Sequence, residues 1–490
     1  MDVIVTLVNY RIRLSLRWNS GSSNTDMKIL FVYPDIGVRG GARSYQFGVG
    51  MLSAVLKAHG HETRLHYMFG AYDPAPLKQT LAVYQPDLIA FSAVSPQFRF
   101  VKQIFKDLQP LPAFTILGGH HATLAPECLD SIEGLDAICI GEGEYPLLEL
   151  AAALQQGKDP RTIRNLWVQT RDQGIVKNPT RPFREDLDTL PFSDRELFDY
   201  QQIINSDFHT ALFMFSRGCP YDCTFCSNHA LRTRQEGKYV RFRSVTSCLQ
   251  EIRAVLDRYS LRSLYFNDDC FTTHRDFVDA FCARYSRECA LPFAINARPE
   301  TLNDDVCRVL KAAGCHRVSI GIESGSESFR REVLGRRQSN ERIAEAFAAC
   351  RRAGIRTKSF NIVVFPHETP AIFQETVDLN TRIQPDSVII GIFEPYPGTK
   401  LTEVCLQEGF IPKDQPDTWF MGRMDTILTM PAFPRREILR CFRNFAYQVY
   451  KQHAPLKALF YKIYYSPAGE RLIRALAPVK DILRRLVMGV

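Results

Sequence analysis

The stretch "SRGCPYDCTFCSNHA", residues 216–230, spaces Cys219, Cys223 and Cys226 as C-x3-C-x2-C. A structural zinc site takes four ligands, usually as two C-x2-C pairs, and the chain has no second such pair. Three thiolates instead suit a [4Fe–4S] cluster that keeps one iron open to another ligand. The alternative is three incidental cysteines. It is disfavoured because the motif directly follows the apolar run "TALFMFS".

Around this motif, short apolar runs alternate with helical patterns from about residue 208 to residue 405. Six runs are strand candidates: "TALFMFS", "SLYFNDD", "PFAINAR", "RVSIGIES", "TKSFNIVVFP" and "DSVIIGIFEPYP". Segments such as "SCLQEIRAVLDRY" and "ERIAEAFAACRRAG" have helical periodicity and lie between them. This alternation predicts a partial (β/α)6 barrel, whose functional residues gather where the strands end.

A similar alternation precedes it, over residues 27–154. "KILFVYP", "PDLIAFSAV", "FTILGG" and "DAICIGEG" read as strands, and "FGVGMLSAVLKAHGH" reads as a helix that ends at Gly60. The pattern predicts a doubly wound, Rossmann-like domain, and such a sheet binds ligands at the carboxyl ends of its strands. Those ends carry Ser92, "GGHHAT" (residues 118–123) and "GEGE" (residues 141–144).

The 490 residues are therefore divided into an N-terminal extension (1–26), the doubly wound domain (27–154), a proline-containing connector (155–205), the barrel (206–420) and a helical C-terminal region (421–490). No run of 18 apolar residues occurs, so no transmembrane helix is expected. The start of the chain lacks the pattern of a signal peptide. The 14 cysteines are dispersed rather than regularly spaced, which favours a reducing cytoplasm.

The cysteine motif, with Phe225 in C-x3-C-x-Φ-C, resembles the signature of the radical S-adenosylmethionine (radical SAM) superfamily, and the resemblance extends over residues 208–405. It implies that Cys219, Cys223 and Cys226 hold the cluster and that the open iron binds S-adenosylmethionine. An electron from an external reductant, such as a flavodoxin or ferredoxin, then splits this cofactor to a 5′-deoxyadenosyl radical.

Other cofactor contacts follow from the same resemblance, strand by strand. Asn267 in "NDDCF" matches the contact to the methionine amino group, and Arg298 in "NARPE" matches a partner of its carboxylate. Glu323 and Ser324 in "GIESGSE" match the ribose-binding segment. The alternatives are a surface ion pair for Arg298 and a structural salt bridge for Glu323.

Residues 27–154 resemble the cobalamin-binding domain found ahead of many radical SAM domains. Glycines at the strand ends of that fold let the backbone lie against the corrin or its nucleotide tail. The implied contacts are Ser92, Gly118, Gly119, His120, Thr123, Glu142 and Gly143. The alternative is a generic nucleotide-type domain that binds nothing.

The sequence departs from these families at two loops. The cobalamin family's Asp-x-His-x-x-Gly loop is absent after Asp35, so the implied cobalt has no histidine from this loop, which favours its low-valent state and methyl transfer. After the fifth barrel strand, "VFPHE" replaces a glycine-rich "GLPGE" turn, with Val364 and His367 at two of its positions. For His367 a solvated loop histidine is expected rather than an acid or base.

The C-terminal region is basic and aromatic. Residues 431–490 contain 12 Lys and Arg against 3 Asp and Glu, so the rest of the +8 chain sums to −1. Helices that cap the barrel and present a solvated basic face are expected first. Contact with an anionic membrane surface, on its inner face, is the second interpretation. Nucleic-acid binding is disfavoured because no stacking platform is evident.

These resemblances imply a cobalamin-dependent radical SAM methyltransferase, similar to class B enzymes, that methylates an unactivated carbon of a small-molecule, lipid-like or polycyclic substrate through the 5′-deoxyadenosyl radical and methylcobalamin. The first alternative is a non-methylating member, an oxidative cyclase or a ring-rearranging oxidoreductase. A methylthiotransferase is disfavoured because the front domain has only Cys128 and Cys139. A non-enzymatic electron-transfer or sensing role is also disfavoured. No catalytic residue is assigned, although Glu394 and Tyr396 could face the substrate or merely close the barrel.

Overall fold

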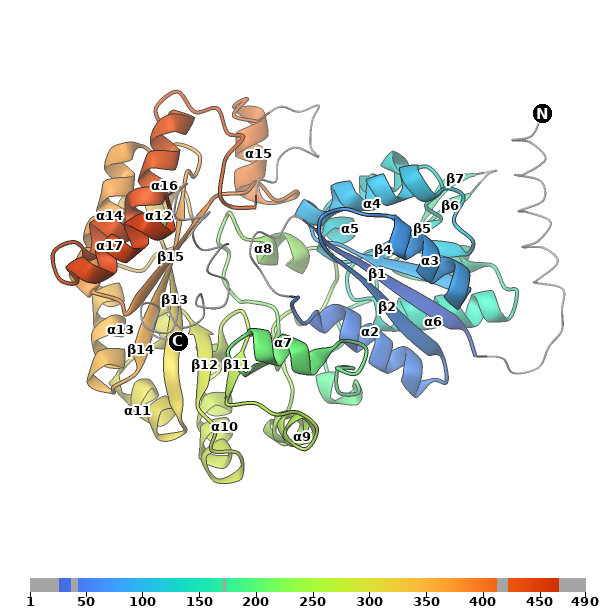
Figure 1. The fold of residues 1–490 in the computed structure, drawn as a ribbon, viewed down its shortest axis with the longest axis horizontal. Helices are drawn as coiled ribbons and strands as arrows, with labels where there is room; N and C mark the ends of the chain where they lie inside the picture. Colours follow the sequence, from blue (N-terminus) through green and yellow to red (C-terminus); the bar gives the residue numbers. More distant parts are fainter. Residues whose placement is uncertain (1–25, 37–42, 171–172, 412–421, 467–490) are drawn as a thin grey trace.

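The computed structural model describes residues 26–36, 43–170, 173–411 and 422–466 (Figure 1). The predicted N-terminal extension, except for Asp26, and the tail cations at positions 471, 474, 484 and 485 lie outside these residues. Within the described ranges, no helix is long and apolar enough to cross a membrane.

The front domain contains a seven-stranded sheet in the order β2-β1-β3-β4-β5-β6-β7. The first five strands pair in parallel, which confirms the doubly wound prediction. Their bounds are β1 (Lys28–Ile36), β2 (Glu62–Gly70), β3 (Leu88–Ser92), β4 (Phe114–Gly118) and β5 (Ala137–Cys139). The sequence did not predict β2, because its "ETRLHYMFG" run opens with three polar residues, lies at a sheet edge and is largely half-buried.

Helices cover both faces of this sheet because its central strands are apolar on both sides. Phe31 of β1 packs in one core with α2 (Phe47–Ala58) and α6 (Glu144–Gln155). Its neighbour Leu30 packs in another core with α3 (Ala75–Tyr84) and α4 (Ser95–Leu108). Successive strand residues point to opposite faces, so a fully apolar strand needs two helical layers.

The segment predicted as a connector also extends the sheet. β6 (Leu166–Thr170) pairs antiparallel with β5, and β7 (Gly174–Lys177) pairs antiparallel with β6. The helix α7 (Tyr200–Ser206) then leads into the barrel, where its Tyr200 and Ile204 lie in a core shared by both domains. The connector is therefore partly structural, and it joins the two domains through buried apolar contacts.

The second domain is an open barrel of six parallel strands in the order β15-β14-β13-β12-β11-β8, which confirms the predicted partial (β/α)6 architecture. β8 and β15 are the two edges of this sheet and do not pair with each other. The strands are β8 (Thr210–Phe213), β11 (Ser263–Phe266), β12 (Phe293–Ala297), β13 (Cys315–Glu323), β14 (Arg356–Val363) and β15 (Ser387–Ile392).

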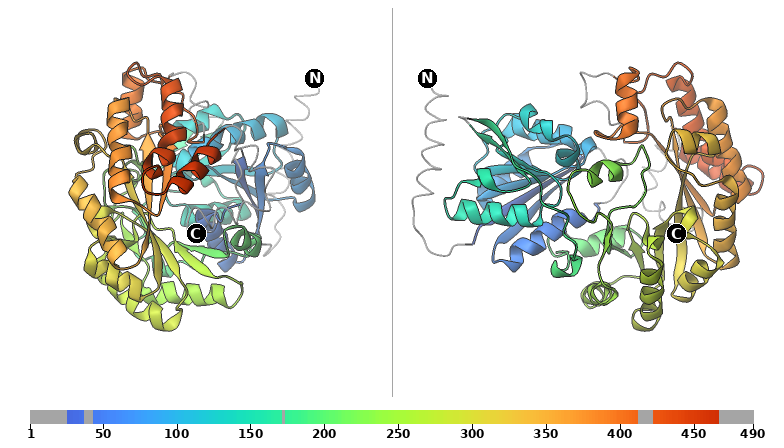
Figure 2. Two further views of the ribbon diagram at one scale, coloured as in Figure 1. Left: turned by 60° about the vertical axis from the view of Figure 1, so that its left-hand side comes forward. Right: turned by 180° about the vertical axis from the view of Figure 1, so that it is seen from behind.

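The barrel helices lie on the convex side, while the concave side faces the front domain (Figures 1 and 2). They are α9 (Val245–Leu256), α10 (Arg275–Glu288), α11 (Asp304–Ala312), α12 (Glu327–Glu332), α13 (Asn340–Arg352) and α14 (Pro370–Ile383). Shorter elements lie in the loops, namely α5 (His120–Leu124), β9 (Ser216–Arg217), α8 (Ser227–Arg232), β10 (Arg241–Phe242) and α15 (Lys400–Gln407).

Two C-terminal helices complete the outer layer, as expected for a cap. α16 (Arg435–Tyr450) packs against α14 and β15, and α17 (Pro455–Tyr464) packs against α16. Phe445 and Tyr450 on α16 are buried, and Tyr461 of α17 stacks on Tyr450 with ring centroids 5.5 Å apart. The aromatic residues of the tail that the structure describes therefore serve mainly as core.

Candidate active site

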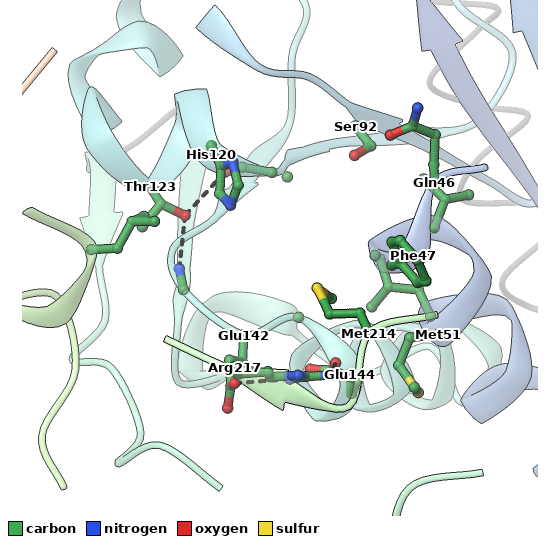
Figure 3. Close-up of a pocket in the computed structure, with 18 of the residues that line it drawn as sticks. Gln46, Phe47, Met51, Ser92, His120, Thr123, Glu142, Glu144, Met214 and Arg217 are labelled. Carbon is green, nitrogen blue, oxygen red and sulfur yellow. Dashed lines mark hydrogen bonds and ion pairs between the residues drawn. The ribbon is translucent and has the colours of Figure 1, made fainter. Parts of the chain in front are cut away.

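A cavity of about 520 Å³ lies where the strand ends of the front domain meet the start of the barrel (Figure 3). The structure brings all seven predicted cobalamin positions together in its lining: Ser92, Gly118, Gly119, His120, Thr123, Glu142 and Gly143. The barrel contributes residues on both sides of the cysteine motif, including Met214, Arg217, Gly218 and Asn228. One space is thus shared by the predicted cobalamin residues and the residues that flank the cysteine motif, while the three cysteines and the predicted S-adenosylmethionine contacts lie outside its lining.

The loops on the front-domain side are held by tight backbone packing. Gly119 has φ +95°, and a Cβ atom there would lie 2.7 Å from the carbonyl oxygen of Ala93, so only glycine fits. The Thr123 hydroxyl donates to the carbonyl of Gly119 at 3.0 Å and accepts from the amide of Gly141 at 3.0 Å. Thr123 therefore joins the two predicted cobalamin loops and shapes the cavity wall.

His120 and His121 point in different directions. His120 projects into the cavity, where water reaches its ring although protein surrounds it (Figure 3). Desolvation lowers the pKa of His120, and the charge of Asp269, across the cavity on the barrel side, opposes that shift. His121 is buried and stacks on Phe98 with ring centroids 4.0 Å apart. Of the two, only His120 is placed to contact a ligand in the cavity.

Ion pairs join the front domain to the cysteine loop. Glu142 accepts from Arg217 and from Arg241, each at 2.8 Å, and Glu144 accepts from Arg217 at 2.6 Å. Burial alone would raise the pKa of Glu142, but the two arginines outweigh it and lower the pKa to about 2. We call Glu142, Glu144, Arg217 and Arg241 the interdomain clamp. Arg217 precedes Cys219 by two residues, so the clamp connects the two cofactor loops.

The cysteine motif leaves the barrel at the carboxyl end of β8. Asp268 holds this departure, since its Oδ1 accepts from the amides of Phe215 at 2.9 Å and Ser216 at 2.6 Å. Gly218 has φ +84°, and a Cβ atom there would lie 2.6 Å from the carbonyl oxygen of Tyr239. The loop conformation therefore requires this glycine.

The three thiols have an environment that fits a cluster. Cys223 is buried and its Sγ accepts from Arg298 Nη1 at 3.1 Å, while Cys226 Sγ accepts from Asn228 Nδ2 at 3.6 Å. Burial raises the pKa of the Cys219 thiol to about 12, so the thiolate form needs a bound cation. N–H donors to sulfur are typical of iron–sulfur sites.

Among the described residues, no three His, Cys, Asp or Glu side chains converge closely enough to hold a single metal ion. A zinc site needs that convergence. A cubane cluster does not, because each thiolate binds a different iron. The donor set therefore fits a cluster better than a mononuclear metal.

Two of the residues predicted to bind S-adenosylmethionine, Arg298 and Glu323, are held by ion pairs near the cysteine loop. Arg298 stacks on the ring of Tyr221 at 3.6 Å and pairs with Glu300 at 2.7 Å. Glu323 has φ +69° and pairs with Arg336 at 3.5 Å. Arg298 and Glu323 both lie near Cys223, Arg298 by its own contact and Glu323 through Arg336, which reaches Cys223 Sγ at 3.9 Å.

The remaining predicted contacts differ in accessibility. Asn267 is exposed at the end of β11, and Phe225 packs on Phe365 with centroids 5.3 Å apart. Ser324 is fully buried, and its Oγ accepts from the amide of Ser326 at 3.4 Å. The structure therefore does not bring the Ser324 hydroxyl to an open surface.

The loop after β14 keeps a turn without the glycines of the family pattern. Val364 and His367 both adopt left-handed backbone conformations, with φ +75° and +66°. A carboxyl oxygen of the buried Glu368 accepts from the amides of Val364 and Phe365 and so fixes the turn. His367 is exposed and pairs with Glu408 at 3.1 Å, consistent with the expected solvated loop histidine.

Sequence reasoning missed several residues of this site. Arg217 had a local signal, because it stands directly before the Gly218–Cys219 pair, but Arg241 and Asp269 had none that could be separated from ordinary surface charge. Their importance arises from contacts across the domain boundary, which no local pattern reveals.

Comparison with known proteins agrees with this geometry. Residues 35–151 match the B12 binding domain, and residues 213–379 match the Radical SAM superfamily. An uncharacterized methyltransferase of Pyrococcus horikoshii, PH0819, is 28% identical over 334 residues, covering 67% of this chain and 71% of that protein. The anaerobic magnesium-protoporphyrin IX monomethyl ester cyclase of Rubrivivax gelatinosus is 25% identical over 392 residues, covering 76% of this chain and 69% of that protein.

A solved structure has the same fold. The radical S-adenosylmethionine methyltransferase TsrM from Kitasatospora setae, with cobalamin and a [4Fe–4S] cluster bound, superposes with a TM-score of 0.64 at 17% identity, covering 79% of this chain and 76% of that one. Both family matches coincide with the domains whose strand ends line the cavity. The chain is therefore a radical SAM enzyme that carries an N-terminal B12-binding domain.

Proposed function

We propose that this chain is a cobalamin-dependent radical SAM methyltransferase that acts on an unactivated carbon of a small-molecule or lipid-like substrate. One observation carries the proposal. The strand ends of the B12-binding domain and the residues flanking the cysteine motif line the same cavity. A methyl donor held by the first and a radical source held by the second would act on one substrate in one space.

In this proposal Cys219, Cys223 and Cys226 ligate the [4Fe–4S] cluster, and Arg298 donates to the Cys223 sulfur. S-adenosylmethionine contacts are assigned by position to Phe225, Asn267, Arg298, Glu323 and Ser324. Ser324 is fully buried, with its amide bonded to Ile322 and its carbonyl to Arg330, so its contribution would be to hold the segment that presents Glu323. Arg298 would exchange Glu300 for the cofactor carboxylate, since both are anionic partners of one guanidinium.

Cobalamin contacts are assigned to the cavity-lining Ser92, Gly118, Gly119, His120 and Gly143. Glu142 and Thr123 position these loops, Glu142 through the interdomain clamp and Thr123 through its two backbone hydrogen bonds. When bound, the cluster with S-adenosylmethionine supplies the hydrogen-abstracting radical, and cobalamin supplies the methyl group. The chain itself orients these groups and excludes water from the apolar part of the cavity.

The cavity lining favours a substrate with an apolar part. Phe47, Met51 and Met214 face the cavity, and Met214 is 37% exposed although it is apolar (Figure 3). The second candidate is a non-methylating enzyme such as an oxidative cyclase. It is favoured by the cyclase relative of Rubrivivax gelatinosus, which aligns over 392 residues, more than PH0819 does.

Two partners are proposed outside the cavity. An external reductant of the flavodoxin or ferredoxin class would deliver the electron that reductive cleavage requires. The chain would work in the cytoplasm, and α17 would contact the inner face of an anionic membrane. Leu456, Leu459 and Ile463 on α17 form an apolar stripe that is 85%, 53% and 47% exposed, and Lys457 and Lys462 flank it.

The membrane contact is tested by co-sedimentation with vesicles. The chain should bind vesicles that contain anionic lipid and not neutral ones, and Leu459→Glu should abolish the binding. Equal recovery with both vesicle types would refute the contact.

The function is tested by anaerobic reconstitution of the full chain, with iron and cobalt counted before any substrate is added. With a substrate that is turned over, methylation predicts S-adenosylhomocysteine together with 5′-deoxyadenosine and a product heavier by one methyl group. A product without the added methyl group, formed without S-adenosylhomocysteine, selects the non-methylating alternative. Loss of iron and turnover together in Cys223→Ala, but not in Cys441→Ala, ties the result to the assigned ligands.

A further inference from the structure

A smaller cavity of about 180 Å³ lies at the amino ends of the barrel strands, at the opposite end from the active-site loops. It is lined by Thr210, Arg262, Ser263, Ala294, His316 and Arg317, among others. Arg317 pairs with Ala294 on one neighbouring strand and with Arg356 on the other, so all three side chains lie on one face of the sheet. The neighbouring Val318 is buried beneath the helices, which places Arg317 on the concave face.

Buried donors in this cavity have no acceptor. Within the part of the chain that the structure describes, Nε and Nη1 of Arg317 and Nδ1 of His316 are inaccessible to solvent and make no hydrogen bond. Buried polar groups are almost always hydrogen-bonded, because an unmet donor loses its hydration without compensation. The two unmet N–H groups lie on opposite sides of the guanidinium and cannot share one acceptor, but an unpaired cation that lines a cavity favours an anion there, and a small shift of the Arg317 side chain would let it donate to an oxyanion.

The surrounding charge is predominantly positive. Arg262 lines the cavity and Arg356 is the strand partner of Arg317, and both are exposed. Lys358 lies two residues beyond Arg356 on the same face. Burial, and then the charge of Arg317, lower the pKa of Lys358 to about 8, while Asp207 opposes this shift. Burial, and then Arg317 and Arg356, also lower the pKa of His316 to about 4. Among the described residues, the carboxylate of Asp207 thus faces several cations, and an added anion would relieve their repulsion.

We propose that this cavity binds a small oxyanion, a phosphate or carboxylate group, through Arg317, with His316 as a second donor and Lys358 as a nearby counter-charge. Arg317 precedes Glu323 by six residues on β13, or roughly 20 Å along the strand. The site is therefore separate from the predicted S-adenosylmethionine contacts, yet it opens on the same concave face. The oxyanion is either a free ion or the charged end of a molecule that extends along the barrel interior.

The test uses the full chain with cluster and cobalamin reconstituted, in phosphate-free buffer, so it does not depend on methyl transfer. Isothermal titration calorimetry with inorganic phosphate should show saturable binding. Arg317→Met should weaken it at least tenfold, and Arg317→Lys should weaken it less. Arg308→Met, an exposed arginine on α11, is the control that removes the same net charge and should leave binding unchanged.

Octyl phosphate separates the two sources of the oxyanion. Binding at least tenfold tighter than inorganic phosphate, and equally sensitive to Arg317→Met, identifies the charged end of a longer molecule. Equal affinity identifies a free ion. Absence of saturable binding of both probes, or equal weakening by Arg308→Met and Arg317→Met, overturns the site. Circular dichroism of each variant separates lost binding from misfolding.

Discussion

The interdomain clamp gives a stability prediction that can be worked out from its geometry. Glu142 is 18% exposed and Arg241 is 2% exposed, so this ion pair is largely desolvated. The pKa of Glu142 falls from its ordinary 4.5 to about 2 in the folded chain. At about 1.4 kcal/mol per pKa unit, the ionised carboxylate stabilises the fold by about 3 kcal/mol. Glu142→Gln should therefore lower the free energy of unfolding by about that amount at pH 7.

The pH dependence has a definite sign. Because the folded pKa is depressed, the stabilisation is complete above pH 4.5 and is lost as the pH falls toward 2. The difference between the wild-type chain and Glu142→Gln should be constant above pH 5 and should shrink progressively below pH 4.5. Urea unfolding under anaerobic conditions, followed by both fluorescence and circular dichroism, measures this difference.

A double-mutant cycle isolates the pair from the rest of the clamp. Glu142→Gln and Arg241→Met should be coupled by at least about 1 kcal/mol, because each single change leaves a buried charge unpaired. The exposed pair of Glu196 and Arg258, each 63% exposed, is the matched control, and Glu196→Gln should cost no more than about 1 kcal/mol. Loss of less than 1 kcal/mol in Glu142→Gln, or a difference that persists unchanged at pH 3, would refute the reasoning.

Three further predictions concern the cofactors and the loop after β14. Cys223→Ala should lose most reconstituted iron and the visible absorption of the cluster, whereas Cys441→Ala, on α16, should keep both; equal iron in the two variants contradicts the assignment. Gly119→Ala should weaken cobalamin binding at least tenfold in a visible-absorption titration, because its Cβ would lie 2.7 Å from a carbonyl oxygen. Gly174→Ala, which is also at positive φ but has open space around it, should leave cobalamin binding unchanged. Equal losses of binding in the two variants would indicate general destabilisation. Burial raises the pKa of Glu368 from 4.5 to about 8, so the free energy of unfolding of the wild-type chain should fall as the pH rises through that interval. Glu368→Gln should remove this fall from the plot of unfolding free energy against pH. Identical plots for the two proteins would contradict the prediction.

Local patterns were sufficient for most of the fold. Strands such as residues 387–392 are short apolar runs between helical segments, and their order along the chain dictates a parallel sheet. The cysteine motif could also be predicted, since its spacing is a property of neighbouring residues. The β6–β7 hairpin was not, because its strands have five and four residues and mix polar with apolar side chains.

The functional site could be predicted only in part from the sequence, for a different reason. The sequence marked Glu142 as a cofactor contact because it stands in a strand-end loop, but the side chain is taken up by Arg217 and Arg241, 75 and 99 residues away. Likewise, the Ser324 hydroxyl is of a type that binds ribose, but Ser324 is fully buried and its carbonyl accepts a hydrogen bond from Arg330. Such outcomes depend on which groups meet after folding, and residue type and position do not encode them.

The unpaired edges of the barrel sheet have a consequence for selectivity. A closed cylinder admits a molecule only through its ends, and its bore limits the width of what can enter. Because β8 and β15 do not meet, the barrel is open along one side, and the front domain supplies part of the missing wall of the cavity. Discrimination between candidate molecules then depends on side chains from both domains.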